Sequence, residues 1–96
     1  MDIGKLMAQA KKMQEELQTK LRELKVEGSA GGGMVKVVMD GTRTLVDVKI
    51  SPEVFEEADL EMLQDLIVAA FQDAYQKVEE ESGKIIASLG IPPGLM

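Results

Sequence analysis

The side chains best suited to chemistry are cationic and amide groups spaced along residues 3–25, a segment with helical periodicity. At about 100° per residue, one flank of its apolar stripe is lined by Lys11, Gln14, Gln18, Arg22 and Lys25. Ammonium and guanidinium groups bind phosphate oxygens well, and amides add neutral hydrogen bonds. This flank is therefore a candidate surface for a phosphate-bearing partner.

The opposite flank is mixed in charge, because Lys5 and Lys12 are joined there by Glu16 and Glu23. When spacing alone is considered, a solvated helix surface with pairs such as Glu16–Lys20 is the simpler interpretation of both flanks. The net charge of -6 does not favour a nucleic-acid partner either. Residues 1–51, however, carry nine basic and seven acidic residues, whereas residues 52–96 carry two and ten. A polyanion would therefore meet the N-terminal part of the molecule.

Catalytic chemistry has little support in this sequence. There is no His and no Cys, so the commonest general base, the thiol nucleophile and most transition-metal sites are excluded. The carboxylates of Glu79–Glu81 are consecutive, and neighbours in a helix do not share a face. Gly31–Gly33 lacks the Lys-Ser/Thr pair of a phosphate-binding loop and is better explained as a turn. We expect no enzyme activity, no metal, no cofactor and no small-molecule substrate.

The segment Ile3–Lys25 is predicted to be one long helix. Its apolar residues at alternating spacings of three and four are Ile3, Leu6, Ala10, Met13, Leu17 and Leu24. Such a helix is roughly 33 Å long, whereas strands of five or six residues span only ~17–20 Å. The helix should therefore overhang its sheet, and a second copy of the chain is the simplest cover for the overhang.

The central segment Gly31–Ile50 predicts strands and turns. Apolar residues alternate in Met34–Asp40 and again in Thr44–Ile50, where Val46, Val48 and Ile50 share a face. Asp40-Gly41 is a favoured turn pair because glycine accepts a positive φ. Gly31–Gly33 predicts a second turn that joins a shorter strand around Leu24–Ala30. The result is a three-stranded antiparallel meander over residues 26–50.

Residues 51–89 are predicted to be helical, with Ser51 and Asp59 as candidate N-caps. A wide apolar stripe begins at Leu60, and Ser82-Gly83 is a candidate position for a kink or break. Gly90 and the prolines after it end the helix and leave a tail at 90–96. The fold class is α+β: a long N-terminal helix, a meander and a long C-terminal helix in a single domain, 1–96.

The absence of cysteine excludes a disulfide framework. The first residues lack the apolar region of a signal peptide, and no run approaches the ~20 apolar residues of a membrane span. We therefore expect a soluble cytoplasmic protein with no membrane partner.

Four motifs resemble the YbaB/EbfC family of bacterial nucleoid-associated proteins. They are L-M-x-Q-A-x-x-M-Q at Leu6–Gln14, G-G-G-M-V-K-V at Gly31–Val37, E-M-L-Q-D-L-I-V-A-A-F-Q-D-A at Glu61–Ala74 and P-P-G-L at Pro92–Leu95. They cover nearly the whole chain in order. Departures are mild: Gln72 stands where the family often has Asn, Gln64 where Glu is usual, and Lys11 where Gln is common.

The resemblance implies a tweezer-shaped homodimer that binds duplex DNA with broad or weak sequence preference. It also implies a nucleoid-associated location, a possible influence on nucleoid organisation and gene expression, and no catalytic activity. The helical arms are the expected DNA-contacting parts. On helix geometry, the candidate DNA-binding residues are Lys5, Lys11, Lys12, Arg22 and Lys25, with Arg43 as an additional candidate. The expected core of the dimer is Leu66, Ile67, Ala70 and Phe71.

An alternative function is a protein-interaction or chaperone-like dimer whose helical arms hold a polypeptide and have no DNA role. The acidic composition and the methionine content favour it. Salt dependence separates the two, because phosphate contacts release counterions and an apolar grip does not.

Overall fold

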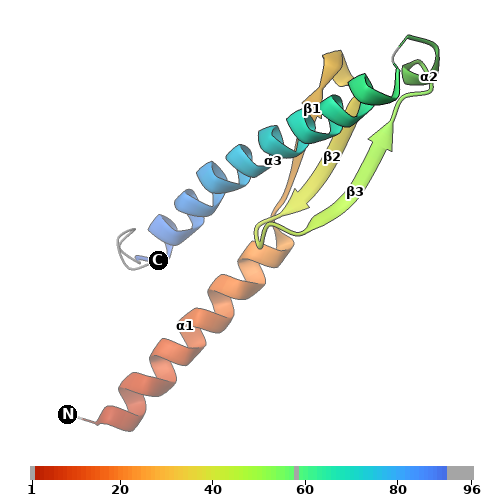
Figure 1. The fold of residues 1–96 in the computed structure, drawn as a ribbon. Helices are drawn as coiled ribbons and strands as arrows, with labels where there is room; N and C mark the ends of the chain where they lie inside the picture. Colours follow the sequence, from red (N-terminus) through yellow and green to blue (C-terminus); the bar gives the residue numbers. More distant parts are fainter. Residues whose placement is uncertain (1, 58, 91–96) are drawn as a thin grey trace.

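The computed structural model describes residues 2–57 and 59–90 (Figure 1). Its elements are α1 (Ile3–Glu23), β1 (Lys25–Ala30), β2 (Val35–Asp40), β3 (Leu45–Ile50), α2 (Val54–Glu57) and α3 (Leu60–Ser88), with a 3₁₀ turn at Gly31–Gly33. The three strands form one antiparallel sheet in the order β1-β2-β3. The predicted α+β class, with a helix, a meander and a second long helix, is confirmed.

Helix α3 lies across the sheet and covers β1 and β2 (Figure 1). The core between them consists of Val35, Val37 and Met39 from β2 with Ala70, Ala74 and Val78 from α3. Small residues allow the close approach, because a Cβ added at Gly28 of β1 would lie 2.7 Å from the Ala74 Cβ. The alternation in β2 therefore separates a buried face from an exposed one, as its sequence predicts.

The two turns use glycine for different reasons. Gly31, Gly32 and Gly33 all have a positive φ in the turn between β1 and β2, where the sequence predicts a turn. The turn between β2 and β3 lies at Asp40–Arg43 as predicted, but its positive φ falls on Arg43 (67°) and not on Gly41. Gly41 is needed for space: a Cβ there would lie 2.9 Å from the Leu21 Cα.

The helix boundaries differ from the prediction in two places. Helix α1 ends at Glu23, two residues before the predicted Lys25, because Leu24 is extended and Lys25 pairs with Asp40 in the sheet. Helix α3 runs through Gly83 without a break, since one glycine costs a helix only about 1 kcal/mol. Asp59 caps α3 as predicted, with its carboxylate accepting from the Met62 N–H at 2.8 Å. The predicted tail lies outside the described residues beyond Gly90.

Helix α1 projects from the body as an arm (Figure 1). The molecule measures 67 × 20 × 18 Å, and only Leu17 and Leu21 of α1 are buried. Nearer the N-terminus the apolar stripe is exposed, as at Ile3 (70%) and Leu6 (49%). The predicted overhang is therefore present. Within the described residues, no helix is both long and apolar enough to cross a membrane.

Candidate nucleic-acid interface

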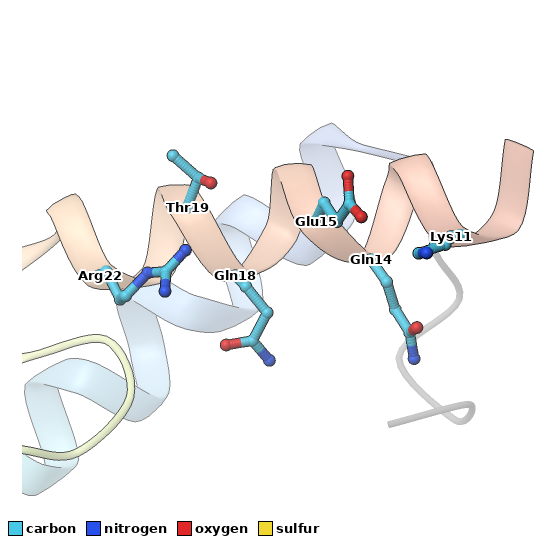
Figure 2. Close-up of a pocket in the computed structure, with 6 residues that line it drawn as sticks. All are labelled: Lys11, Gln14, Glu15, Gln18, Thr19 and Arg22. Carbon is cyan, nitrogen blue, oxygen red and sulfur yellow. The ribbon is translucent and has the colours of Figure 1, made fainter. Parts of the chain in front are cut away.

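The flank of α1 predicted to face a phosphate-bearing partner is present in the structure, and it carries four of the five expected side chains. Lys11, Gln14, Gln18 and Arg22 line one shallow concavity together with Glu15 and Thr19. The amides of Gln14 and Gln18 point to the same side of the helix, while Glu15 and Thr19 point away from them (Figure 2). We call Lys11, Gln14, Gln18 and Arg22 the α1 flank.

The α1 flank is built by a helix with well-satisfied ends. The Asp2 carboxylate caps its first turn by accepting from the Gly4 N–H at 3.0 Å. Lys11 and Arg22 are eleven residues apart, which corresponds to about 16 Å along the helix axis. Both are exposed, and neither takes part in an ion pair with another described residue. Two cations at this separation can reach different phosphates of one nucleic-acid backbone.

The other predicted cations have less favourable surroundings. Lys12 lines a second concavity of α1 with Lys20 and the acids Glu15, Glu16 and Glu23, so an anion there would meet three carboxylates. Lys5 is exposed in the first turns of α1 and lies outside both concavities.

Lys25 does not belong to the α1 flank, because it begins β1. Its ammonium donates to the Arg22 carbonyl at the C-terminal end of α1, where a cation stabilises the negative end of the helix dipole.

Arg43 is held by α3. One of its guanidinium nitrogens lies 2.6 Å from Glu79 Oε1, and its Cζ lies 5.3 Å from the centre of the Tyr75 ring. The hydrogen bond that the Arg43 guanidinium donates to the Glu79 carboxylate raises the pKa of Arg43 above its ordinary value. A phosphate at Arg43 would have to compete with this carboxylate.

The outer edge of β1 is closed by two side chains of α3. The Ser29 N–H donates to Asp73 Oδ2 at 3.0 Å, and the Lys77 ammonium donates to the Glu27 carbonyl at 3.0 Å. Asp73 and Lys77 also form an ion pair at 3.0 Å. The pKa of Asp73 is lowered mainly by the hydrogen bond from the Ser29 N–H and, to a smaller extent, by the hydrogen bond from Lys77. An added strand therefore finds the Ser29 N–H and the Glu27 carbonyl of β1 already bonded.

The side of β3 that faces the same way as the core is uncovered. Cross-strand pairing places Val48 opposite Val37 and Ile50 opposite Val35, yet both β3 residues are exposed (41% and 36%). The register shift at Val38/Met39 sets Leu45, not Val46, opposite Met39, which differs from the predicted face. Sequence alternation predicts an apolar face on β3, but it does not predict that α3 leaves this face uncovered.

The four residues predicted to form a dimer core have different positions. Ala70 is completely buried within its own chain, and Leu66 and Ile67 are partly buried against the same core. Phe71 is exposed (38%) and stacks with Tyr75, whose ring also meets Arg43 of the β2–β3 loop. Because Asp73 and Lys77 mark the β1 side of α3, Phe71 and Tyr75 mark its β3 side. Val68 lies three residues before Phe71 on α3 and is also exposed.

Fold and site together define a small α+β protein that presents a cationic and amide flank on a projecting helix. A model of the YbaB/EbfC DNA-binding family matches residues 1–91. The chain belongs to this family, as its sequence motifs predict.

Its relatives include bacterial proteins named nucleoid-associated proteins. One from Xylella fastidiosa is 47% identical over 100 aligned positions that cover 97% of this chain and 92% of the relative. One from Rhizobium meliloti is 41% identical and covers 98% and 94% of the two chains. A crystal structure of an uncharacterized protein from Helicobacter pylori has a TM-score of 0.72 at 30% identity, covering 93% of this chain and 97% of that one.

Proposed function

We propose that this protein is a nucleoid-associated protein that binds duplex DNA as a homodimer, through phosphate contacts from its two α1 arms. The observation that carries the proposal is the α1 flank, an exposed row of cationic and amide groups on a projecting helix, in a chain of a DNA-binding family. Phosphate contacts position a protein on DNA without reading its sequence, so the proposed sequence preference is broad.

Arrangement of charge supports binding through α1. Residues 1–51 contain nine of the eleven basic residues, and residues 52–96 contain ten of the seventeen acids. In α3, Glu79 and Glu80 are exposed and repel phosphate. The arm therefore approaches DNA while α3 is kept away from it, and the affinity of each arm stays modest.

The uncovered apolar surface supports a homodimer. It consists of Leu45, Val48 and Ile50 on β3 with Val68, Phe71 and Tyr75 on the adjacent side of α3. A second copy related by a two-fold axis can cover this surface with its own equivalent, because such an interface uses the same patch on both chains. Since Ala70 packs within its own chain, we place the centre of the interface on Phe71 and Val48.

The test is a titration of labelled duplex DNA, followed by fluorescence anisotropy from low to physiological salt. Binding that weakens steeply with salt is expected, because each neutralised phosphate contributes about -0.9 to the slope of log K against log salt. The absence of binding at low salt would overturn the DNA proposal. Sedimentation equilibrium tests the assembly, and a folded species at the 10.5 kDa chain mass would overturn the dimer.

One observation favours a second candidate, a dimer whose arms hold a polypeptide. The distal part of α1 exposes Ile3, Leu6, Met7 and Met13, an apolar stripe that phosphate does not require. Binding of an unfolded polypeptide with little dependence on salt, together with no binding of DNA, would select this alternative.

A further inference from the structure

The α1 arm meets the β2–β3 loop at one direct backbone contact. The Gly41 N–H donates to the Leu21 carbonyl at 2.7 Å, near the C-terminal end of α1. A Cβ at Gly41 would collide with the backbone of Leu21, so the loop lies directly against the helix. Any displacement of the loop therefore displaces the base of the arm.

The β2–β3 loop is stiff because one carboxylate organises it. Asp40 Oδ1 accepts from the Thr42 N–H (2.8 Å), the Thr42 hydroxyl (2.6 Å) and the Thr44 N–H (3.1 Å). The Arg43 N–H donates to the Asp40 carbonyl at 3.0 Å. Five successive residues thus move as one unit, and the position of Arg43 fixes the position of Gly41.

The far side of this loop is tied to α3. Arg43 has a φ of 67°, an uncommon conformation for a residue with a side chain, and its guanidinium reaches Glu79 at 2.6 Å and the Tyr75 ring at 5.3 Å. The loop consequently bridges the last turns of α1 and the middle of α3. We call this connection, from Leu21 through Gly41 and Arg43 to Glu79, the strut.

The strut crosses a hollow. A cavity of about 390 Å³ is lined by Leu21, Gly41, Arg43, Glu79, Ser82, Gly83 and Ile86. The hydroxyl of Ser82 is buried there without a hydrogen-bond partner among the described residues. Side-chain packing therefore leaves part of the space between the base of the arm and α3 unfilled, and the strut adds to the packing of Leu17 and Leu21 in holding the arm.

We infer that Arg43, through its ion pair with Glu79, is a positioning residue that sets the direction in which the α1 arm leaves the body. The role differs from the phosphate contact expected for Arg43 from the sequence. Its consequence for DNA rests on the proposed function, whereas its effect on the arm does not. Because α1 carries the α1 flank, the strut determines where Lys11 and Arg22 lie relative to the same residues of a second copy.

The first measurement needs no DNA. The chain contains no cysteine, so Gln9→Cys on the arm and Gln72→Cys on α3 provide two unique sites for spin labels. Labelled chains are diluted into an excess of unlabelled chains, and pulsed electron paramagnetic resonance then reports the distance within one chain. The parent should give one narrow distance distribution. Arg43→Ala and Glu79→Gln should each widen it, and combining them should add nothing, because either one breaks the same pair.

Exchanging the charges tests the pair itself. A variant with both Arg43→Glu and Glu79→Arg should narrow the distribution again. Glu80→Gln is the matched control, because it removes the same charge from the next residue of α3 and should leave the distribution unchanged. A parental distribution in Glu79→Gln, or equal widening in Glu80→Gln, would overturn the inference. Glu79→Gln is nearly isosteric and exposed, and circular dichroism should show an unchanged fold.

DNA affinity gives an independent readout, because general electrostatics and the strut predict different affinities for Glu79→Gln. Both glutamine variants remove a negative charge, so general electrostatics should strengthen DNA binding in each. If the strut positions the arms, Glu79→Gln should instead bind about two- to fivefold more weakly than Glu80→Gln, the range that an exposed ion pair can supply. DNA binding by Glu79→Gln that is as tight as, or tighter than, binding by Glu80→Gln would refute the positioning role in DNA binding. Loss of DNA binding in every protein, including the parent, would refute the proposed function while the distance measurement still decides the strut.

Discussion

Replacing Lys11 and Arg22 together by alanine should flatten the salt dependence of DNA binding. The two cations belong to the α1 flank, and in a two-fold dimer they supply four cationic sites. If each site neutralises one phosphate, their loss makes the slope of log K against log salt shallower by about 3.6. Alanine is the best helix former and both side chains are exposed, so the arm itself should stay folded.

The size of the effect makes it measurable. A slope of 3.6 corresponds to a change in affinity of about 150-fold when salt rises from roughly 50 to 200 mM. The parent should weaken by at least this factor over that range. The double variant should bind more weakly at low salt and respond less to added salt.

Fluorescence anisotropy with two labelled duplexes of unrelated sequence is the appropriate assay. Both duplexes should be affected equally, because phosphate contacts carry no sequence information. The matched control replaces Lys36 and Lys49 by alanine, which removes the same charge from two exposed residues paired across β2 and β3. An unchanged slope in the α1 variant, or an equal change in the sheet variant, would refute binding through the α1 flank.

Three further outcomes follow from packing and electrostatics. Glycine-to-alanine substitution should have opposite effects on the free energy of unfolding at two positions, as measured by thermal unfolding. Gly28→Ala should lower it by more than about 1 kcal/mol, because the added Cβ would collide with Ala74. Gly83→Ala should raise it by about 0.5–1 kcal/mol, because nothing lies within 4 Å of the added Cβ. Asp73 has a lowered pKa, so its contribution to stability is present above the unfolded-state pKa near 3.9 and is lost as the pH falls through the folded-state pKa. Asp73→Asn should therefore make acid unfolding less steep. An acid-unfolding profile identical to that of the parent would contradict this. Val48→Asp should convert the dimer to monomer in sedimentation equilibrium, because it places a charge at the centre of the proposed interface, and a stable dimer would move that interface elsewhere.

Much of the fold could be predicted because the local signals agree with one another. Alternation in Val35–Asp40, the Gly31–Gly33 turn and the Asp59 cap all occur where the sequence indicates them. Each depends on residues close together in the chain, and no distant contact competes with it.

The predictions that differ from the structure do so because of contacts between segments that are distant in the sequence. The sequence places Gly41 in the turn for its φ, yet the nearby backbone of Leu21 is what excludes a side chain there. Arg43 takes the positive φ instead, and Glu79, thirty-six residues later, holds its side chain. Helical periodicity places Lys25 on the flank of α1, but its pairing with Asp40 makes it part of β1.

The candidate site shows the same division. The α1 flank follows from the 3.6-residue period, so Lys11, Gln14, Gln18 and Arg22 could be grouped from sequence alone. The sequence prediction does not include Thr19, although its spacing of three residues from Arg22 places it at the same concavity. The apolar period of α3 likewise could not separate Ala70, buried against its own sheet, from Phe71, which is left exposed.

The unequal edges of the sheet limit how many chains an assembly can contain. Asp73 and Lys77 occupy two backbone groups at the outer edge of β1, the Ser29 N–H and the Glu27 carbonyl, whereas no side chain of the described residues bonds to the outer edge of β3. A chain with two open edges can recruit neighbours on both sides and grow into a fibre. A chain with one closed edge can pair only through its open edge, here β3. A pair of chains that covers β3 of both partners leaves no open edge. In the proposed dimer, growth through the sheet would therefore end at two chains.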